Sequence, residues 1–145
     1  MNTIESQFTQ LLRAKGYSVT KPRLFIFRLL VGTPPQSMRA IIQKSAGHVD
    51  RVSAYRIIEL FEQLNIVHRI TIGWKYTIEL SDTFLKHHHH LSCLGCAKVI
   101  HVEDTQAIDT LISALCQTYD FQLTAHQLEL QGYCNDCRGA VVVAN

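Results

Sequence analysis

The stretch DRVSAYRIIELFEQLNIVHRITIGWKYTIEL, residues 50–80, changes its hydrophobic period half-way along. Its first part carries apolar side chains at intervals of three and four residues: Ala54, Ile57, Ile58, Phe61 and Leu64. This spacing predicts an amphipathic helix over residues 50–64 that begins at Asp50. Residues 66–80 instead alternate between apolar and other side chains on either side of Gly73, which predicts a β-hairpin.

Three further helices are predicted before this stretch. An apolar stripe marks the first, which ends near Gly16, and Thr20 is placed to cap the second. Ser37 follows two prolines and is placed to cap the third. Helices followed directly by a two-stranded hairpin predict a winged helix-turn-helix.

The exposed face of the fourth helix is the expected DNA-reading surface. In a winged helix-turn-helix this helix enters the major groove, and side chains near its start reach base edges. Val52 is placed to contact a thymine methyl, Tyr55 a base or phosphate, and Arg56 a phosphate or guanine. The alternative is a solvated helix face without any DNA contact, because the fold hosts other functions.

Charge and ligand residues divide the chain into two parts. Residues 1–83 hold 11 Lys and Arg against 6 Asp and Glu, a formal charge of +5, and residues 84–145 carry −3. All five cysteines and six of the eight histidines lie in the second part. A basic part suits a polyanion, and a part rich in Cys and His suits a metal.

The composition also bears on the compartment. No run of apolar residues is long enough for a membrane span, and MNTIESQFTQ, residues 1–10, lacks the pattern of a signal peptide. We therefore expect a cytoplasmic protein with no membrane partner. In that reducing compartment cysteines are more often metal ligands than disulfides.

Two Cys-x-x-Cys pairs carry the strongest chemical signal. Cys93 and Cys96 form the first, Cys134 and Cys137 form the second, and 37 residues separate them. Each pair can turn two thiolates toward one ion, so together they predict a tetrahedral structural Zn²⁺ site. The alternative is four unrelated buried cysteines. Cys116 stands alone in a helical stretch and is expected to be a small buried apolar residue.

Four consecutive histidines, His87 to His90, precede the first cysteine pair. If this run is extended, His87 and His89 point to one side of the strand, and His88 and His90 point to the other. One run then supplies two imidazoles to each of two metal sites. The candidates for further ligands are Glu79, His101, Asp109 and His126, each of which is also explained as an ordinary surface or core residue.

The second part predicts a small sheet with one helix. Residues 99–102 and 121–131 have strand patterns, and residues 108–115 have an amphipathic helical pattern. Its core is thin, so zinc binding and homodimerisation are expected to supply stability. The predicted fold class is α+β, with a winged-helix DNA-binding domain over residues 1–83 and a metal-binding dimerisation domain over residues 84–145.

Taken together, these segments resemble the ferric uptake regulator family of metal-dependent bacterial repressors. The matching segments follow the family order over residues 4–137: 20–23, 53–56, 60–67, 78–80, 87–91, 93–96, 98–100 and 134–137. The resemblance implies a winged helix hinged to an α+β dimerisation domain. No HExxH motif and no nucleophile paired with a base is present, so we expect neither an enzyme nor a small-molecule substrate.

The resemblance assigns roles to particular residues. It places a structural zinc on the four paired cysteines. It places the regulatory metal, between the domains, on Glu79, His88, His90 and His101. It places a second metal, within the dimerisation domain, on His87, His89, Asp109 and His126. It adds Thr20, Arg23 and Ser53 to the expected DNA contacts Val52, Tyr55 and Arg56.

The chain departs from the family pattern in three ways. The family often has Asp at the position of His89 and a carboxylate at that of His101, so Glu103 is the alternative regulatory ligand. Residues 33–37 lack the histidine that relatives offer, and residues 78–86 lack the cysteine of many zinc sensors. Histidines at positions where relatives use carboxylates favour zinc as the effector metal. Iron(II) and manganese remain alternative effectors.

The expected function is a homodimeric, metal-responsive repressor of metal-uptake genes, sensing zinc or iron. It is expected to bind a palindromic double-stranded DNA operator when Zn²⁺ or Fe²⁺ occupies the regulatory site. One alternative is a peroxide-sensing member of the same family, which requires iron. The other is a zinc storage or chaperone protein, which requires no DNA.

Overall fold

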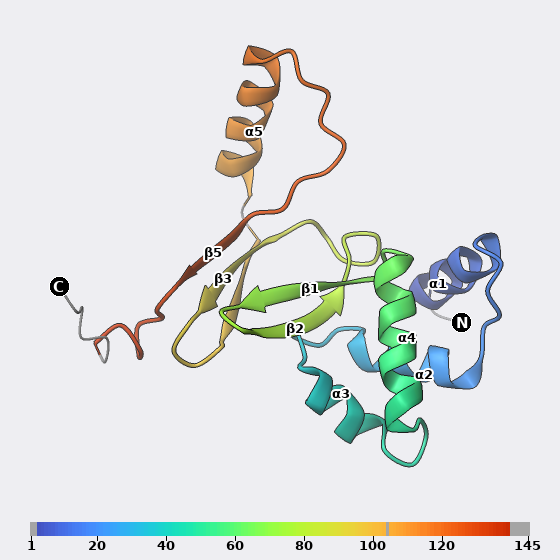
Figure 1. Ribbon diagram of the computed structural model, residues 1–145. Coiled ribbons are helices and arrows are strands. Elements are labelled where there is room, and N and C mark those ends of the chain that lie inside the picture. Colours follow the sequence, from blue (N-terminus) through green and yellow to red (C-terminus); the bar gives the residue numbers. More distant parts are fainter. Residues whose placement is uncertain (1–2, 104, 140–145) are drawn as a thin grey trace. The chain divides into compact units, whose positions relative to one another are not determined.

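The computed structural model describes residues 3–103 and 105–139, and the chain divides between Lys86 and His87 into two compact units. The elements of the first unit are α1 (Thr3–Ala14), α2 (Lys21–Leu30), α3 (Met38–Ser45), α4 (Arg51–Gln63), β1 (Val67–Ile72) and β2 (Lys75–Leu80) (Figure 1). The elements of the second are β3 (His89–Cys93), β4 (Val99–Val102), α5 (Gln106–Thr118) and β5 (Glu129–Gly132). The predicted α+β class is confirmed, as is a first unit of four helices and a hairpin.

Side chains cap three helices of the first unit, and two of these caps, Thr20 and Ser37, were predicted as such. The side-chain oxygens of Thr20, Ser37 and Asp50 each accept a hydrogen bond from the backbone N–H three residues later. Such bonds satisfy N–H groups that have no partner within the helix. Asp50 therefore fixes the start of α4.

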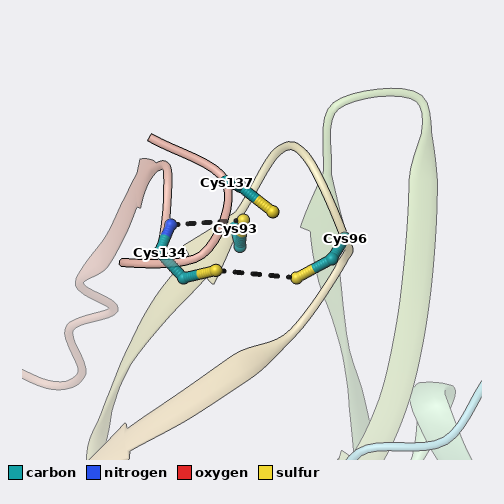
Figure 2. A group of neighbouring side chains, drawn as sticks. All are labelled: Cys93, Cys96, Cys134 and Cys137. Carbon is teal, nitrogen blue, oxygen red and sulfur yellow. Dashed lines mark hydrogen bonds between the residues drawn. The ribbon is translucent and has the colours of Figure 1, made fainter. Parts of the chain in front are cut away.

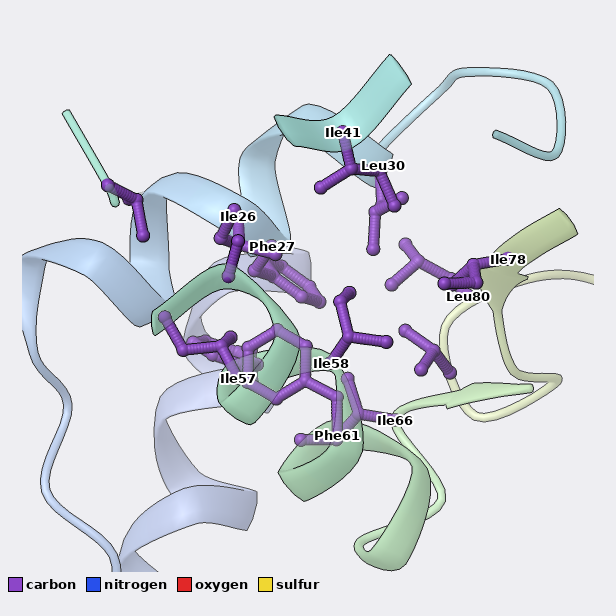
Figure 3. Close-up of a cluster of buried hydrophobic side chains, with 14 of the residues drawn as sticks. Ile26, Phe27, Leu30, Ile41, Ile57, Ile58, Phe61, Ile66, Ile78 and Leu80 are labelled. Carbon is purple, nitrogen blue, oxygen red and sulfur yellow. The ribbon is translucent and has the colours of Figure 1, made fainter. Parts of the chain in front are cut away.

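The helices of the first unit and its hairpin share one hydrophobic core (Figure 3). At its centre Phe8 of α1 stacks on Phe27 of α2 at 4.1 Å between ring centroids and meets the edge of Phe61 of α4 at 5.4 Å. The hairpin adds Ile78 and Leu80, which are fully buried. The predicted apolar stripe of α4 thus faces the core, except that Leu64 at its end is only half-buried.

The hairpin is tied to the end of α4. β1 and β2 pair antiparallel, and Gly73 in the turn between them has a φ of 61°, which favours glycine. Arg69 of β1 donates two hydrogen bonds to the carboxylate of Glu62 on α4 and packs on the ring of Tyr76 at 4.4 Å. These contacts hold the hairpin against the helix before it.

The second unit is a three-stranded sheet with one helix. Its strand order is β4-β3-β5, with β3 antiparallel to β4 and parallel to β5. The prediction of a strand over residues 121–131 is wrong for its first part, because only Glu129–Gly132 is a strand. Glu129 pairs with His90 in parallel register, and β3 begins at His89, so earlier residues have no strand beside them.

Much apolar surface of the second unit is exposed. No residue of α5 is fully buried, and Leu111 and Leu115 are 60% and 50% exposed. Ile100 and Leu130, on the outer strands β4 and β5, are exposed as well. Among the described residues, no helix has the length and apolar character needed to cross a membrane.

Candidate metal centres and nucleic-acid interface

The sheet of the second unit brings the two cysteine pairs together. Cys93 ends β3 opposite Gly132, the last residue of β5, and the strands run in the same direction. The turn after β3 and the loop after β5 therefore leave the same end of the sheet, and they carry Cys96, Cys134 and Cys137. Figure 2 shows the four thiols turned toward one another.

The distances between these thiols fit a zinc ion. All four Sγ atoms lie within 4.8 Å of one another, and Cys96 Sγ and Cys134 Sγ are 3.8 Å apart. Zinc–sulfur bonds of about 2.3 Å in a tetrahedron place neighbouring sulfurs about 3.8 Å apart. A disulfide needs about 2.05 Å, and all four cysteines are free thiols. The chemistry and spacing of this donor set thus suit Zn²⁺.

The backbone around the thiols favours a thiolate at one position. The N–H of Cys134 points at Cys93 Sγ at 3.3 Å and, with the N–H groups of Cys96 and Gly95 in the turn after β3, lowers the pKa of Cys93 to about 6. Hydrogen bonds with the other three thiols, that of Cys134 first, raise the pKa of Cys137 to about 12. Binding of a metal to Cys137 would therefore release a proton.

Gly95 permits the close approach of the two cysteine turns. A Cβ atom on Gly95 would lie 2.9 Å from both Cβ and Sγ of Cys137. Real Cβ contacts are longer, so any larger residue here would push the turns apart. The sequence showed this glycine only as one residue of a Cys-x-x-Cys pair.

The alternating histidines lie in two clusters, as their spacing predicted. On one side, His87 and His89 lie 4.8 Å apart between ring centroids, and His126 Nε2 lies 3.1 Å from His87 Nε2. Asp109 of α5 joins them, with its Oδ1 4.0 Å from His87 Nε2. Ligand atoms of these four residues all lie within 4.8 Å of one another.

The second histidine cluster lies on the other face of β3. His88 and His90 rings are 4.7 Å apart, and the ring of His101 lies 4.6 Å from His88 and 5.3 Å from His90. His101 is the cross-strand partner of His90 in the β3–β4 register. Glu103, the alternative ligand, is not part of any ligand group found among the described residues.

Glu79 belongs to the first unit and remains a predicted ligand of this cluster. It lies on β2, is buried, and forms a 2.9 Å hydrogen bond through Oε1 with Nε2 of His68 on β1. His68 was not among the predicted site residues. The strand register pairs it directly with Glu79, and that pairing is the signal that identifies it.

The predicted DNA-contact residues lie in the first two turns of α4 and at the start of α2. Val52, Tyr55 and Arg56 are exposed on α4. Ser53 instead donates its hydroxyl to Asp50 Oδ2 at 2.5 Å, which strengthens the cap. At α2, Thr20 serves as the cap and Arg23 donates to the carbonyl of Ser18 at 2.6 Å.

The fifth cysteine stands apart from these clusters. Cys116 on α5 is half-buried, so its expected full burial is wrong for the isolated chain. It belongs to a helix with no fully buried residue.

Comparison with known proteins places this chain in one family. A family model described as the ferric uptake regulator family matches residues 14–131. The chain belongs to the ferric uptake regulator family. The ferric uptake regulation protein of Vibrio vulnificus is 34% identical over 142 residues, which cover 92% of this chain and 93% of that protein.

Two solved structures of the family share the fold. The Vibrio cholerae ferric uptake regulator is 32% identical with a TM-score of 0.71, over 87% of this chain and 98% of that one. The Helicobacter pylori ferric uptake regulator has a TM-score of 0.77 over 94% and 95% of the two chains, and at 23% identity it supports the fold alone. The predicted family is confirmed. Its members are transcriptional regulators rather than enzymes, and the Cys and His clusters support metal binding by this member.

Proposed function

We propose that this protein is a homodimeric, cytoplasmic repressor of metal-uptake genes, which binds a palindromic DNA operator when Zn²⁺ or Fe²⁺ occupies its regulatory site. The observation that carries the proposal is the sorting of one histidine run into two clusters beside a separate four-cysteine cluster. A permanent structural ion and an exchangeable sensed ion need distinct donor sets. Thiolates suit the first, and imidazoles suit a borderline ion that is to be released.

The four cysteines would hold the structural Zn²⁺. Cys93, Cys96, Cys134 and Cys137 come from two turns that share only a short sheet, so a bound ion would cross-link them. Metal binding of this kind is coupled to folding. The site would thus stabilise the second unit without responding to metal supply.

The regulatory metal would bind His88, His90 and His101, with Glu79 as the fourth ligand that the family resemblance suggests. The histidines belong to the second unit and Glu79 to the first. A metal held by both would favour one arrangement of the two units over others. An effector shifts such an equilibrium only by its differential affinity for the two states, and a few kcal/mol suffice.

The second metal would bind His87, His89, Asp109 and His126. This donor set joins β3 to α5 and to the loop before β5. An ion there would order the second unit internally. Its loss should therefore act on stability or on the dimer before it acts on DNA recognition.

The exposed apolar surface of the second unit supports the homodimer. Leu111 and Leu115 of α5 and Leu130 of β5 expose half or more of their surface, and Ile100 of β4 is also exposed. Fully burying an exposed Leu or Ile is worth roughly 1.5–3 kcal/mol, so covering the exposed half of each is worth about half as much. A second copy would cover this surface and place two α4 helices for two half-sites of a palindrome.

The DNA interface would be the start of α4 with support from α2. Arg56, Tyr55 and Val52 are exposed for base or phosphate contact, and Thr20 and Arg23 lie at the start of α2. Ser53, which caps α4 through Asp50, would support the recognition helix and contact DNA only through its remaining hydrogen-bonding capacity.

Metal titration of DNA binding tests this function. A duplex is selected from a random-sequence pool by the purified full chain, in separate selections with Zn²⁺, Fe²⁺ and Mn²⁺. Its binding is then measured against the free concentration of each metal. We expect a palindromic consensus and an affinity that rises steeply with one of these metals. Metal analysis should show one ion that resists chelation. Metal binding without any selected DNA would overturn the proposal and indicate a storage protein. Loss of DNA binding after peroxide treatment of the iron-loaded protein would indicate peroxide sensing.

A further inference from the structure

The tip of the β1–β2 hairpin carries an aromatic side chain that the fold does not use. Trp74 is the only tryptophan of the chain and follows Gly73 in the turn. Its side chain is 88% exposed, more than any other large hydrophobic residue among those described. The neighbouring strands bury Ile72 and Ile78, so the hairpin is held by other side chains.

Exposure of an indole is costly in water. A tryptophan buries roughly 150–250 Å² when it packs, which makes it one of the largest contributors to cores and interfaces. Tight turns are ordinarily formed by Gly, Asn, Asp or Ser, which need no burial. Neither the turn nor the core of the first unit therefore explains this residue.

The immediate neighbour of Trp74 points to an anionic partner. Lys75 Nζ lies 5.0 Å from the centroid of the indole ring, and Lys75 is itself exposed. The pair presents a flat apolar face beside a fixed positive charge. Deoxyribose next to phosphate offers the complementary surface, because the sugar is apolar and the phosphate is anionic.

We propose that Trp74 and Lys75 form the contact of the hairpin with duplex DNA, with the indole packed on deoxyribose and the ammonium paired with a phosphate. The inference rests on the proposed function and extends it to two residues outside the recognition helix. The same unit carries the excess of basic residues, with a formal charge of +5 over residues 1–83. That charge favours a polyanion over an apolar protein surface as the partner.

The single tryptophan makes the contact directly measurable. The probe is the duplex selected from a random pool by the Zn²⁺-loaded full chain. On binding this duplex, wild-type protein should show a changed tryptophan emission and a lower accessibility to iodide and acrylamide. Trp74→Ala should weaken binding on the order of 10-fold, by loss of an aromatic packing contact. Trp74→Phe should retain most of the affinity.

Two further variants separate the roles. Lys75→Ala should reduce the slope of log affinity against log salt by about one. Thr71→Ala, an exposed change on the same hairpin, should leave affinity and salt slope unchanged. Because Trp74 is exposed, Trp74→Ala should melt at the wild-type temperature, which identifies an affinity loss as a lost contact.

The outcomes distinguish this inference from the proposed function. If wild-type protein selects no duplex in any metal, the proposed function fails. If it selects a duplex but Trp74 emission, quencher accessibility and the affinity of Trp74→Ala are all unchanged, the inference fails alone. A quencher accessibility that falls on dimerisation or metal loading without DNA would also overturn it, because Trp74 would then contact protein.

Discussion

His68 Nε2 lies 2.9 Å from Glu79 Oε1, across the register pair that joins β1 to β2. Hydrogen bonds of this kind orient a metal-binding carboxylate, and their loss typically lowers metal affinity about 10- to 100-fold. A hairpin that contacts DNA would thus also hold the carboxylate proposed to bind the regulatory metal. DNA contact and binding of the regulatory metal would then both depend on the β1–β2 hairpin.

His68→Ala should weaken binding of the regulatory metal by about 10- to 100-fold, because Glu79 loses the partner that orients it. The measurement is competition of the full chain with a chelator of known affinity, after the cysteine-bound zinc has been loaded. His48→Ala is the matched control, because His48 stacks on Phe25 and belongs to none of the ligand clusters. If Glu79→Gln lowers the affinity and His68→Ala does not, His68 has no orienting role.

Gly95→Ala should prevent closure of the four-cysteine site. Its new Cβ would lie 2.9 Å from Cβ and Sγ of Cys137, closer than side-chain packing allows. We expect loss of the tightly held zinc and a lower melting temperature. Gly132→Ala is the control, because a Cβ there meets nothing within 4 Å. Both are measured by zinc content per chain and by thermal unfolding, and equal zinc in both variants would contradict the assigned geometry.

Alternate histidines should give different phenotypes. His90→Ala should abolish metal-dependent DNA binding while the cysteine-bound zinc and the dimer remain. His89→Ala, on the other side of β3, should instead lower stability or give a smaller regulatory defect, because it removes a ligand of the other cluster. Metal stoichiometry, sedimentation and DNA titration are compared for both variants. Equal loss of the metal response from all four histidine variants would show that the run serves one site.

Local sequence patterns were sufficient to predict the elements of the first unit and to predict which histidines lie on the same side of β3. The start of α4 follows from Asp50 and the apolar spacing after it, and both signals act within a few residues. The separation of His89 from His90 in β3 follows from strand alternation, which is a property of any extended backbone. These features could therefore be predicted without knowledge of long-range pairing.

Features that depend on strand register could not be predicted in this way. Residues 121–128 have a strand pattern but no neighbour, because β3 begins only at His89. The His68–Glu79 pair and the approach of Gly95 to Cys137 each require two distant segments in one fixed alignment. A single sequence does not determine such alignments.

Asp50 should make the stability of the first unit depend on pH. Hydrogen bonds from the side chain and then the backbone N–H of Ser53 lower the pKa of Asp50 below its ordinary value. A lowered folded-state pKa stabilises the fold above the unfolded-state pKa, and this stabilisation is lost as pH falls through the folded-state pKa. Asp50→Asn retains a capping oxygen without the charge. The difference in melting temperature between wild type and Asp50→Asn should therefore shrink as pH falls from about 5 to about 2. A difference that stays constant over this range would show that the charge of Asp50 contributes nothing.

Arg56→Ala should weaken binding of the selected duplex, because Arg56 is exposed on the side of α4 that we propose to face DNA. If the guanidinium reads a base, the loss should be about 1–3 kcal/mol for the selected duplex, with little change for a scrambled one. If it holds a phosphate, both duplexes should weaken about equally and the salt slope should fall by about one. Lys98→Ala removes the same charge from an exposed site in the second unit and should change neither quantity. Titrations of both duplexes at several salt concentrations separate these cases. An affinity of Arg56→Ala equal to wild type at every salt concentration would exclude α4 as the reading helix at this position.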